Sequence, residues 1–315
     1  MIRDWKNPKA GHLPVLDGRR IAWWCWGNPL APTLLLLHGG PGGGISPGLR
    51  ATFDPEAWQI VAMDQRGSGQ SEPHAGRDLS ALDANTTEDL IVDAERLRTR
   101  LGVENWALFG GSWGASLAQA YAHAHRSVIR GMVLVGVTQS RATEIDWLYG
   151  DLRHLLPEAF AAFQAGAPGA APGRPLVAAY RDLLRSPETA QTAADRWCAW
   201  EAAAIAADPR HQPGSRWQDA VFRLGFARIV THYFAQGAWL RVPLDTCAAD
   251  LGDLPGELVH SRLDLSAPLT TAWELSRAWP GAHLTILQGG LHSAAEGAMQ
   301  QATRDAAQRL RDRLR

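Results

Sequence analysis

The sequence predicts an α/β protein with a mostly parallel central sheet, helices on both faces of that sheet, and a helical insertion. In the first half and near the end of the chain, short apolar runs alternate with helical patterns. Runs that are apolar throughout are typical of strands buried on both faces. Between residues 141 and 239, strand-like runs are absent and alanine-rich helical patterns replace them.

Composition narrows the class of protein. The chain has 315 residues, of which 46% are hydrophobic, and this is enough to bury a sizeable core. A formal net charge of -1 gives no indication of nucleic acid or an anionic membrane as a partner. No signal peptide and no apolar run near the ~20 residues that span a bilayer are visible. The oligomeric state is not indicated.

Three cysteines bear on the compartment. Cys25, Cys198 and Cys247 are odd in number and show no CxxC spacing. This pattern favours reduced thiols over a disulfide framework or a zinc site. We therefore expect a cytoplasmic protein without a bound metal.

Seven strands are expected along the chain. Each is a short apolar run, and several end at glycine-rich or polar turns, where the chain leaves the sheet. These runs lie at residues 20–26, 33–38, 59–63, 106–110, 131–137, 256–261 and 282–288.

Helices are expected between these strands. Residues 86–102 carry apolar side chains at helical spacing, Thr86 and Asp89 form a capping-box pattern, and Gly102 is a suitable stop. Residues 115–125 predict a second helix, and a charged helix closes the chain. Alternating strands and helices predict a parallel sheet covered on both sides. We expect residues 1–140 and 240–315 to form this core, with 141–239 as a helical insertion.

Ser112 lies where an expected buried strand ends and a helix begins. The surrounding GGSWG, residues 110–114, fits the G-x-S-x-G nucleophile elbow. Such a turn strains the serine backbone, and side chains at the flanking positions would collide with the neighbouring strand and helix. An ordinary helix N-cap serine after a glycine turn would fit the same motif. The strand expected before Ser112 and the helix expected after it favour the nucleophile elbow.

A nucleophilic serine needs a base and an acid that orients the base. In this architecture the chain order is serine, acid, histidine, and Asp264 and His292 each follow an expected strand. Carboxyl ends of parallel strands meet at one edge, where ligand sites form. We therefore expect a catalytic triad of Ser112, Asp264 and His292.

Other acids and histidines fit the triad less well. Asp64 precedes the serine, and Asp250 and Asp253 precede a strand instead of following it. Three more histidines lie at or inside expected strands, where packing in the core is the simpler interpretation: His38, His260 and His283.

A glycine-rich run, HGGPGGG at residues 38–44, completes the expected site. Glycines let a backbone N–H approach a substrate oxygen closely, and we expect Gly40 and Trp113 to donate the two N–H groups of an oxyanion hole. A phosphate-binding loop is the rival interpretation, but no Lys-Ser/Thr pair follows the glycines.

Several stretches together resemble the proline iminopeptidase family of α/β-hydrolases. The resemblance implies an α/β-hydrolase fold in which residues 141–239 form a helical cap that sets substrate specificity. It further implies the triad Ser112, Asp264 and His292, and release of an N-terminal residue, typically proline, from short peptides or amides. It also implies that no metal and no organic cofactor takes part. The matching stretches are HGGPGGG (38–44), DQRGSGQS (64–71), ANTTEDL (84–90), GGSWG (110–114), RWCAWE (196–201), FARIVTHYF (226–234), SRLDLSAP (261–268) and GGLHSA (289–294).

Members of that family bind the free amine of the substrate with cap carboxylates. The resemblance places one at Glu201, and Trp200 beside it is expected to contribute to substrate binding. The residues alone leave open a solvated helix carboxylate beside core tryptophans. A second family carboxylate falls at a position where this chain has Val230. Further departures are Ser261, Leu263 and Leu291.

Two alternatives therefore remain beside aminopeptidase action. The missing carboxylate at Val230 favours weak iminopeptidase activity or a shift toward an ester, an amide or a less cationic substrate, as in an esterase or amidase. The other alternative is a ligand receptor built on a hydrolase fold without catalysis. In each case the expected partner is a small molecule, namely a peptide, an amide or an ester.

Overall fold

The computed structural model of the chain describes residues 8–205, 214–290 and 292–314. Its described residues form one eight-stranded sheet in the order β1-β2-β4-β3-β5-β6-β7-β8. From β4 to β8 all neighbours run parallel, whereas β1 with β2 and β2 with β4 are antiparallel. The mostly parallel sheet is confirmed. The strands are β1 (Lys9–Pro14), β2 (Arg20–Gly27), β3 (Thr33–Leu37), β4 (Gln59–Met63), β5 (Trp106–Gly111), β6 (Ile129–Val135), β7 (Gly256–Ser261) and β8 (Ala282–Leu287).

All seven expected strands are present, and their ends agree with the expected ends to within two residues. β1 was not expected. It pairs only with β2 at the edge of the sheet, and Leu13 is its one buried residue. An edge strand of this kind lacks the continuous apolar run that marks the inner strands.

Helices cover both faces of the sheet, as predicted. Alternate residues of the strands face opposite sides, so Leu35 and Leu37 of β3 pack in one core while Leu34 and Leu36 pack in the other. The first core includes helices α2 (Thr87–Arg100), α3 (Trp113–Ala124) and α9 (Leu269–Ala278), and the second includes α1 (Pro47–Arg50) and α10 (Gly297–Arg313). The capping box at Thr86 and Asp89 is confirmed at the start of α2.

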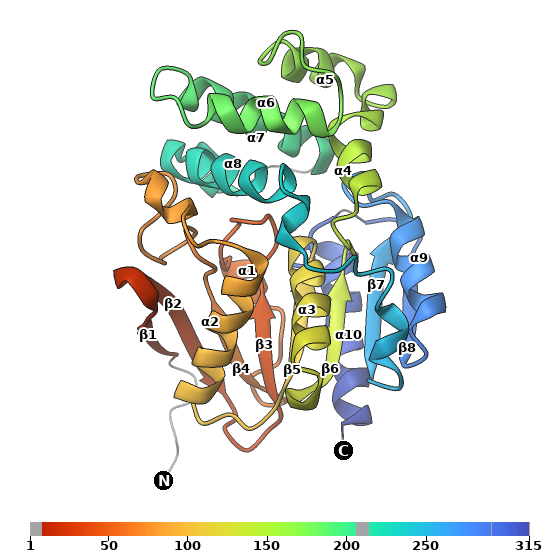
Figure 1. Cartoon of the computed structure of the whole chain (residues 1–315). Coiled ribbons are helices and arrows are strands. Elements are labelled where there is room, and N and C mark those ends of the chain that lie inside the picture. Colours follow the sequence, from red (N-terminus) through yellow and green to blue (C-terminus); the bar gives the residue numbers. More distant parts are fainter. Residues whose placement is uncertain (1–7, 206–213, 291, 315) are drawn as a thin grey trace.

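The helices between residues 142 and 234 lie together beyond one end of the strands (Figure 1). They are α4 (Ala142–Tyr149), α5 (Pro157–Gln164), α6 (Arg174–Leu183), α7 (Ala190–Ile205) and α8 (Ala220–Phe234). We call residues 141–239 the cap and the remainder the sheet part. The cap has its own aromatic core, which includes Tyr149, Phe163, Tyr180, Trp197 and Trp200. That the cap sets specificity stays a prediction.

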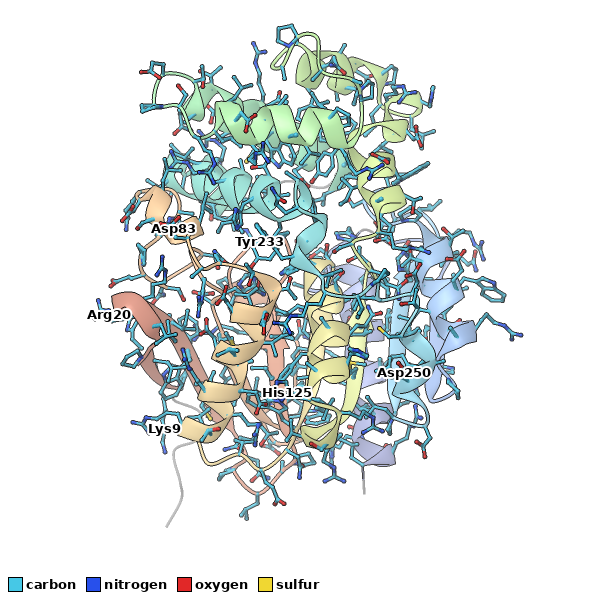
Figure 2. All side chains as sticks on the ribbon, viewed as in Figure 1. Lys9, Arg20, Asp83, His125, Tyr233 and Asp250 are labelled. Atoms are coloured by element: carbon cyan, nitrogen blue, oxygen red, sulfur yellow. The ribbon has the colours of Figure 1, made fainter. Side chains whose placement is uncertain are left out.

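The cap rests on the sheet part through α8. Tyr233, which Figure 2 shows where α8 approaches the sheet part, donates its hydroxyl to Asn85 Oδ1 at 2.8 Å and packs its ring 5.0 Å from that of Trp113. No described helix has the length and apolar character needed to cross a membrane. Short 3₁₀ turns complete the described elements at Leu16–Gly18, Leu79–Leu82, Arg126–Val128, Asp151–His154, Ser215–Gln218, Gly237–Trp239 and Ala248–Leu251.

Candidate active site

Ser112 occupies a strained turn between β5 and α3. Its φ is 54° and its ψ is -124°, a backbone conformation that residues with side chains rarely adopt. Its N–H donates to Val135 O at 2.9 Å, and its carbonyl accepts the Thr138 hydroxyl at 3.0 Å. The strained turn predicted from the sequence is therefore present, and neighbouring hydrogen bonds hold it in place.

Glycines beside Ser112 are required by close backbone contacts. A Cβ on Gly110 would lie 2.2 Å from Gly114 O, and a Cβ on Gly114 would lie 2.1 Å from Leu37 O. Both distances are far below van der Waals contact, so neither position accepts a side chain. The predicted steric reason for the two glycines is confirmed.

Asp264 and His292 meet as a hydrogen-bonded pair. His292 Nδ1 lies 2.6 Å from Asp264 Oδ2, while Asp264 Oδ1 accepts the N–H groups of Ser266 and Ala267, each at 3.0 Å. Burial works to raise the pKa of Asp264, but His292 and these hydrogen bonds hold it below its ordinary value. Burial works to lower the pKa of His292, and the charge and hydrogen bond of Asp264 raise it instead. Each partner thus favours the charged form of the other.

Ser112 and His292 line one cavity of about 210 Å³ between the sheet part and the cap. The Ser112 hydroxyl makes no hydrogen bond to a described residue, so the link between serine and imidazole is not closed in this structure. Hydrogen bonds between catalytic groups are often long without substrate and tighten in the complex. The structure therefore brings all three expected triad residues to one place and joins two of them.

Gly40 and Trp113, the expected oxyanion donors, line the same cavity. Trp113 is the first residue of α3, so its N–H has no partner inside the helix. Gly40 has a φ of +119° and belongs to a loop that packs directly on the elbow, because a Cβ on Gly39 would lie 2.9 Å from Gly111 O. The loop and the start of the helix thus adjoin Ser112 from two sides.

Glu201 of α7 brings a buried carboxylate to the cavity. The Tyr149 hydroxyl donates to Glu201 Oε1 at 2.6 Å. Burial raises the pKa of Glu201 to about 7, and the Tyr149 hydrogen bond and His292 oppose this rise. A cation entering the cavity would offset the burial and favour the charged carboxylate.

Trp200 does not line the cavity, contrary to what its expected role in substrate binding requires. It is 1% exposed, stacks on Phe163 in the cap core, and donates Nε1 to Leu148 O at 3.2 Å. Neighbours on a helix point about 100° apart, so Trp200 faces the cap core while Glu201 faces the cavity.

Val230 also packs in the cap core and is fully buried. The cavity has one other acid among its described lining residues, Glu144, whose position the sequence did not single out. Its oxygens already accept Gln139 N at 3.0 Å, Arg141 Nε at 3.0 Å and the Thr271 hydroxyl at 2.7 Å. Glu144 therefore does not replace the carboxylate missing at Val230.

Of the other histidines, two are core residues as expected and one is not. His38 and His260 are buried, and His260 accepts Val137 N at Nδ1. The His283 side chain is 57% exposed and lies 3.2 Å from Glu257. It is exposed because it belongs to β8, which pairs only with β7 at the edge of the sheet.

Three further observations complete the description of the site. Asp250, placed by the sequence at the wrong end of a strand, lies well away from the cap helices (Figure 2). No group of three His, Cys, Asp or Glu side chains suited to a metal is found within the described residues. Leu291 lies outside them.

Comparisons with known proteins agree with this fold. A family model described as alpha/beta hydrolase fold matches residues 32–297. A probable proline iminopeptidase of Streptomyces coelicolor is 42% identical over 90% of both chains, and the proline iminopeptidase of Neisseria gonorrhoeae is 37% identical over 97% of both. Among solved structures, a proline iminopeptidase of Mycobacterium smegmatis matches with a TM-score of 0.67 at 18% identity, over 97% of this chain and 99% of that one.

Proposed function

Because this chain belongs to the proline iminopeptidase family of α/β hydrolases, we propose that it is a serine hydrolase acting as an aminopeptidase. It releases an N-terminal residue, proline or another small or apolar one, from short peptides or amides. One observation carries the proposal: His292, which is hydrogen-bonded to Asp264, lines the same cavity as the strained Ser112.

The reaction proceeds through a covalent acyl-enzyme. His292 takes the proton of Ser112 as its oxygen attacks the scissile carbonyl, and Asp264 holds the imidazole and stabilises its charged form. The N–H groups of Gly40 and Trp113 receive the developing oxyanion. His292 then protonates the leaving amine, and in a second half-reaction it activates the water that releases the product.

Glu201 supplies specificity for a free amine. Its carboxylate is buried beside the cavity, and Tyr149 occupies one of its oxygens. An ammonium group would pair with the other oxygen and replace the hydration that the carboxylate has lost. This pairing places the N-terminal residue, and hence its carbonyl, at a fixed distance from Glu201.

An esterase or amidase of shifted specificity is the second candidate, and Val230 is the observation that favours it. With an apolar residue at this position, the amine faces one available carboxylate where the family uses two. The candidates separate by substrate: an aminopeptidase needs a free α-amine, whereas an esterase accepts blocked or simple acyl substrates and does not depend on Glu201.

The other proposals concern partners and compartment. The partner is a small peptide, amide or ester, without nucleic acid, membrane or cofactor. The three cysteines, which are free thiols in the structure, support a cytoplasmic location.

A substrate panel tests the function. The 4-nitroanilides of proline, alanine and N-acetylproline are compared with short 4-nitrophenyl esters, and a fluorophosphonate probe is applied to the wild type and to Ser112→Ala. We expect the free-amine anilides to be hydrolysed, N-acetylproline anilide to be inert, and labelling to require Ser112. Turnover of blocked substrates at equal rates would support the esterase, and the absence of both labelling and turnover would leave a ligand receptor.

A further inference from the structure

Gln65, the second residue after β4, contacts both segments that carry the proposed oxyanion donors. It is 2% exposed. Its Nε2 donates to His38 O at 2.9 Å, and its Oε1 accepts Trp113 Nε1 at 2.9 Å. One side-chain amide therefore joins the start of the glycine-rich loop to the first residue of α3.

The backbone of Gln65 strengthens the first of these connections. Its N–H donates to His38 Nε2 at 3.0 Å. Burial lowers the pKa of His38 to about 4, so the ring stays neutral in this role. His38 Nδ1 lies 2.9 Å from Gly39 O and 3.2 Å from Gly44 N, so the ring contacts the glycine-rich loop at two points. Gln65 thus acts on the peptide next to Gly40 through the imidazole as well as through its side chain.

We propose that Gln65 is a positioning residue that sets the separation of the Gly40 and Trp113 N–H groups. The proposal rests on the proposed function, which takes these two groups as the oxyanion donors. Stabilisation of a transition state depends on donors already in place. The Gln65 amide is hydrogen-bonded at both ends. It therefore restrains the glycine-rich loop relative to the start of α3, which neither segment achieves by itself.

The test measures oxyanion binding separately from stability. We compare the wild type with Gln65→Met, which removes both amide contacts, and Gln65→Glu, which keeps the acceptor for Trp113 and loses the donor to His38. The readouts are kcat and KM on the best hydrolysed acyl substrate, and the Kd of the boronic acid analogue of proline, whose serine adduct mimics the transition state. Gln65→Met should lower kcat about 10- to 100-fold with little change in KM, and should weaken the boronate by a similar factor. Gln65→Glu should lie in between.

Gln59→Met is the matched control, because Gln59 begins β4, the strand that Gln65 follows, and its side chain accepts the Thr33 hydroxyl at 2.8 Å at the other end of that strand. It should change the melting temperature but neither kcat nor the boronate Kd. The proposal is overturned if both Gln65 variants keep kcat and the boronate Kd within twofold, or if kcat falls while the Kd stays constant. A Ser112→Ala variant as active as the wild type would instead overturn the proposed function.

Arg216, in the 3₁₀ turn Ser215–Gln218, carries a second and independent inference. It lines the cavity, its Nη1 donates to Gly43 O at 2.7 Å, and its guanidinium lies 5.2 Å from the Phe222 ring centroid. No carboxylate of the described residues lies within ion-pair distance of it. A guanidinium offers five N–H donors, so most of them stay available to a ligand.

The surroundings of Arg216 are those of a concave site. The residue is exposed to solvent, yet the protein around it lowers its pKa. The acids that act on it are Glu296 and Asp64, whereas the charge that acts on Glu201 is His292. Arg216 is fastened to the glycine-rich loop through Gly43 O, whereas Glu201 is fastened to α4 through Tyr149, so the cation and the carboxylate are held by different walls of the cavity.

We infer that Arg216 binds the C-terminal carboxylate of a short peptide whose amine is held by Glu201. This inference rests on the proposed function and narrows its substrate class to free dipeptides and tripeptides. Arginine pairs with a carboxylate through charge-assisted hydrogen bonds of defined geometry. A substrate held at both ends would place its first peptide bond between them, beside Ser112.

The test uses three substrates that differ at the C-terminal side: Pro-Ala, Pro-Ala amide and proline 4-nitroanilide. Wild type should prefer Pro-Ala to its amide about 5- to 20-fold in kcat/KM. Arg216→Met should abolish this preference and keep the anilide within about threefold. Arg223→Met, which removes a cap arginine paired with Asp195 at 2.7 Å, should leave the preference intact.

If Arg216→Met lowers kcat/KM equally for all three substrates, Arg216 only fastens the cap to Gly43, and the inference fails. A wild type with no preference between Pro-Ala and its amide would overturn it as well. If the wild type hydrolyses none of the prolyl substrates, the proposed function itself fails.

Discussion

Asp264 in the sheet part and Glu201 in the cap are buried carboxylates near the same histidine, yet their pKa values shift in opposite directions. Asp264 accepts His292 and two backbone N–H groups of its own loop, and its pKa lies below the ordinary value. Glu201 accepts the Tyr149 hydroxyl, and burial raises its pKa to about 7. At Asp264 the charge and hydrogen bond of His292 outweigh burial, whereas at Glu201 burial outweighs the Tyr149 hydrogen bond and the charge of His292.

This difference separates two tasks. A carboxylate that is charged at every working pH is a fixed part of the machinery, as Asp264 must be to orient His292. A carboxylate close to half-protonated at pH 7 gains charge when a cation arrives, as suits a group that binds substrate. We therefore propose that the sheet part supplies the reaction and that the cap supplies selection of the substrate.

The largest expected effect tests the sheet part alone. Ser112→Ala removes the nucleophile and should lower kcat about 10⁴- to 10⁶-fold, with far-UV circular dichroism unchanged. Ser140→Ala, at another serine on the cavity wall, should stay within about threefold of wild type. Substantial turnover by Ser112→Ala would mean that Ser112 of the sheet part is not the nucleophile.

Asp264→Asn tests the fixed carboxylate. It should lower kcat about 10³- to 10⁴-fold, because the amide no longer holds the imidazole in the working tautomer. Asp250→Asn, far from the cap, serves as the control in the same steady-state assay. An increase in KM with kcat unchanged would mean that Asp264 binds substrate and does not orient His292.

Glu201→Gln tests selection by the cap. Loss of a buried charge partner costs about 2–4 kcal/mol, so kcat/KM for proline anilide should fall about 30- to 1,000-fold. Any blocked acyl ester that the wild type hydrolyses should keep its rate within a few-fold. If kcat/KM falls equally for substrates with and without a free amine, Glu201 does not select the amine, and the proposed division of roles between the sheet part and the cap is wrong.

The smallest effect is on stability. The pKa of Glu201 rises from 4.5 to about 7 on folding, so its burial is free of cost below pH 4.5 and lowers the free energy of unfolding progressively up to pH 7. The difference of 2.5 units from these two values corresponds to about 3 kcal/mol above pH 7. In urea unfolding, Glu201→Gln should therefore gain stability over wild type between pH 5 and pH 8. An unchanged difference across this range would contradict the raised pKa.

The elbow and its glycines were predictable because local sterics leave few choices. Gly110 and Gly114 have no room for a Cβ. Such a constraint requires glycine and can therefore be recognised in the sequence. The inner strands were predictable for a similar reason, since burial on both faces requires apolar residues at every position. β1, with one buried residue, carries no such signature.

Residues of the cap were harder to place because helix packing depends on which way each face turns. Trp200 and Glu201 are neighbours in sequence, but only Glu201 meets the cavity. Gln65 belongs to the matching stretch at residues 64–71, but neither its role nor that of Arg216 has a local signal, since their partners lie 27 or more residues away at His38, Trp113 and Gly43. Contacts of this range follow from the folded arrangement and not from spacing along the chain.

The positive φ of Ser112 has a practical consequence for capturing intact ligands. Holding a residue other than glycine in that conformation costs on the order of 1–3 kcal/mol, and alanine at position 112 would retain the cost. Ser112→Gly relieves it while also deleting the nucleophile. Ser112→Gly should therefore be more stable than Ser112→Ala and better suited to co-crystallisation with uncleaved peptides. It should also melt at a higher temperature than the wild type.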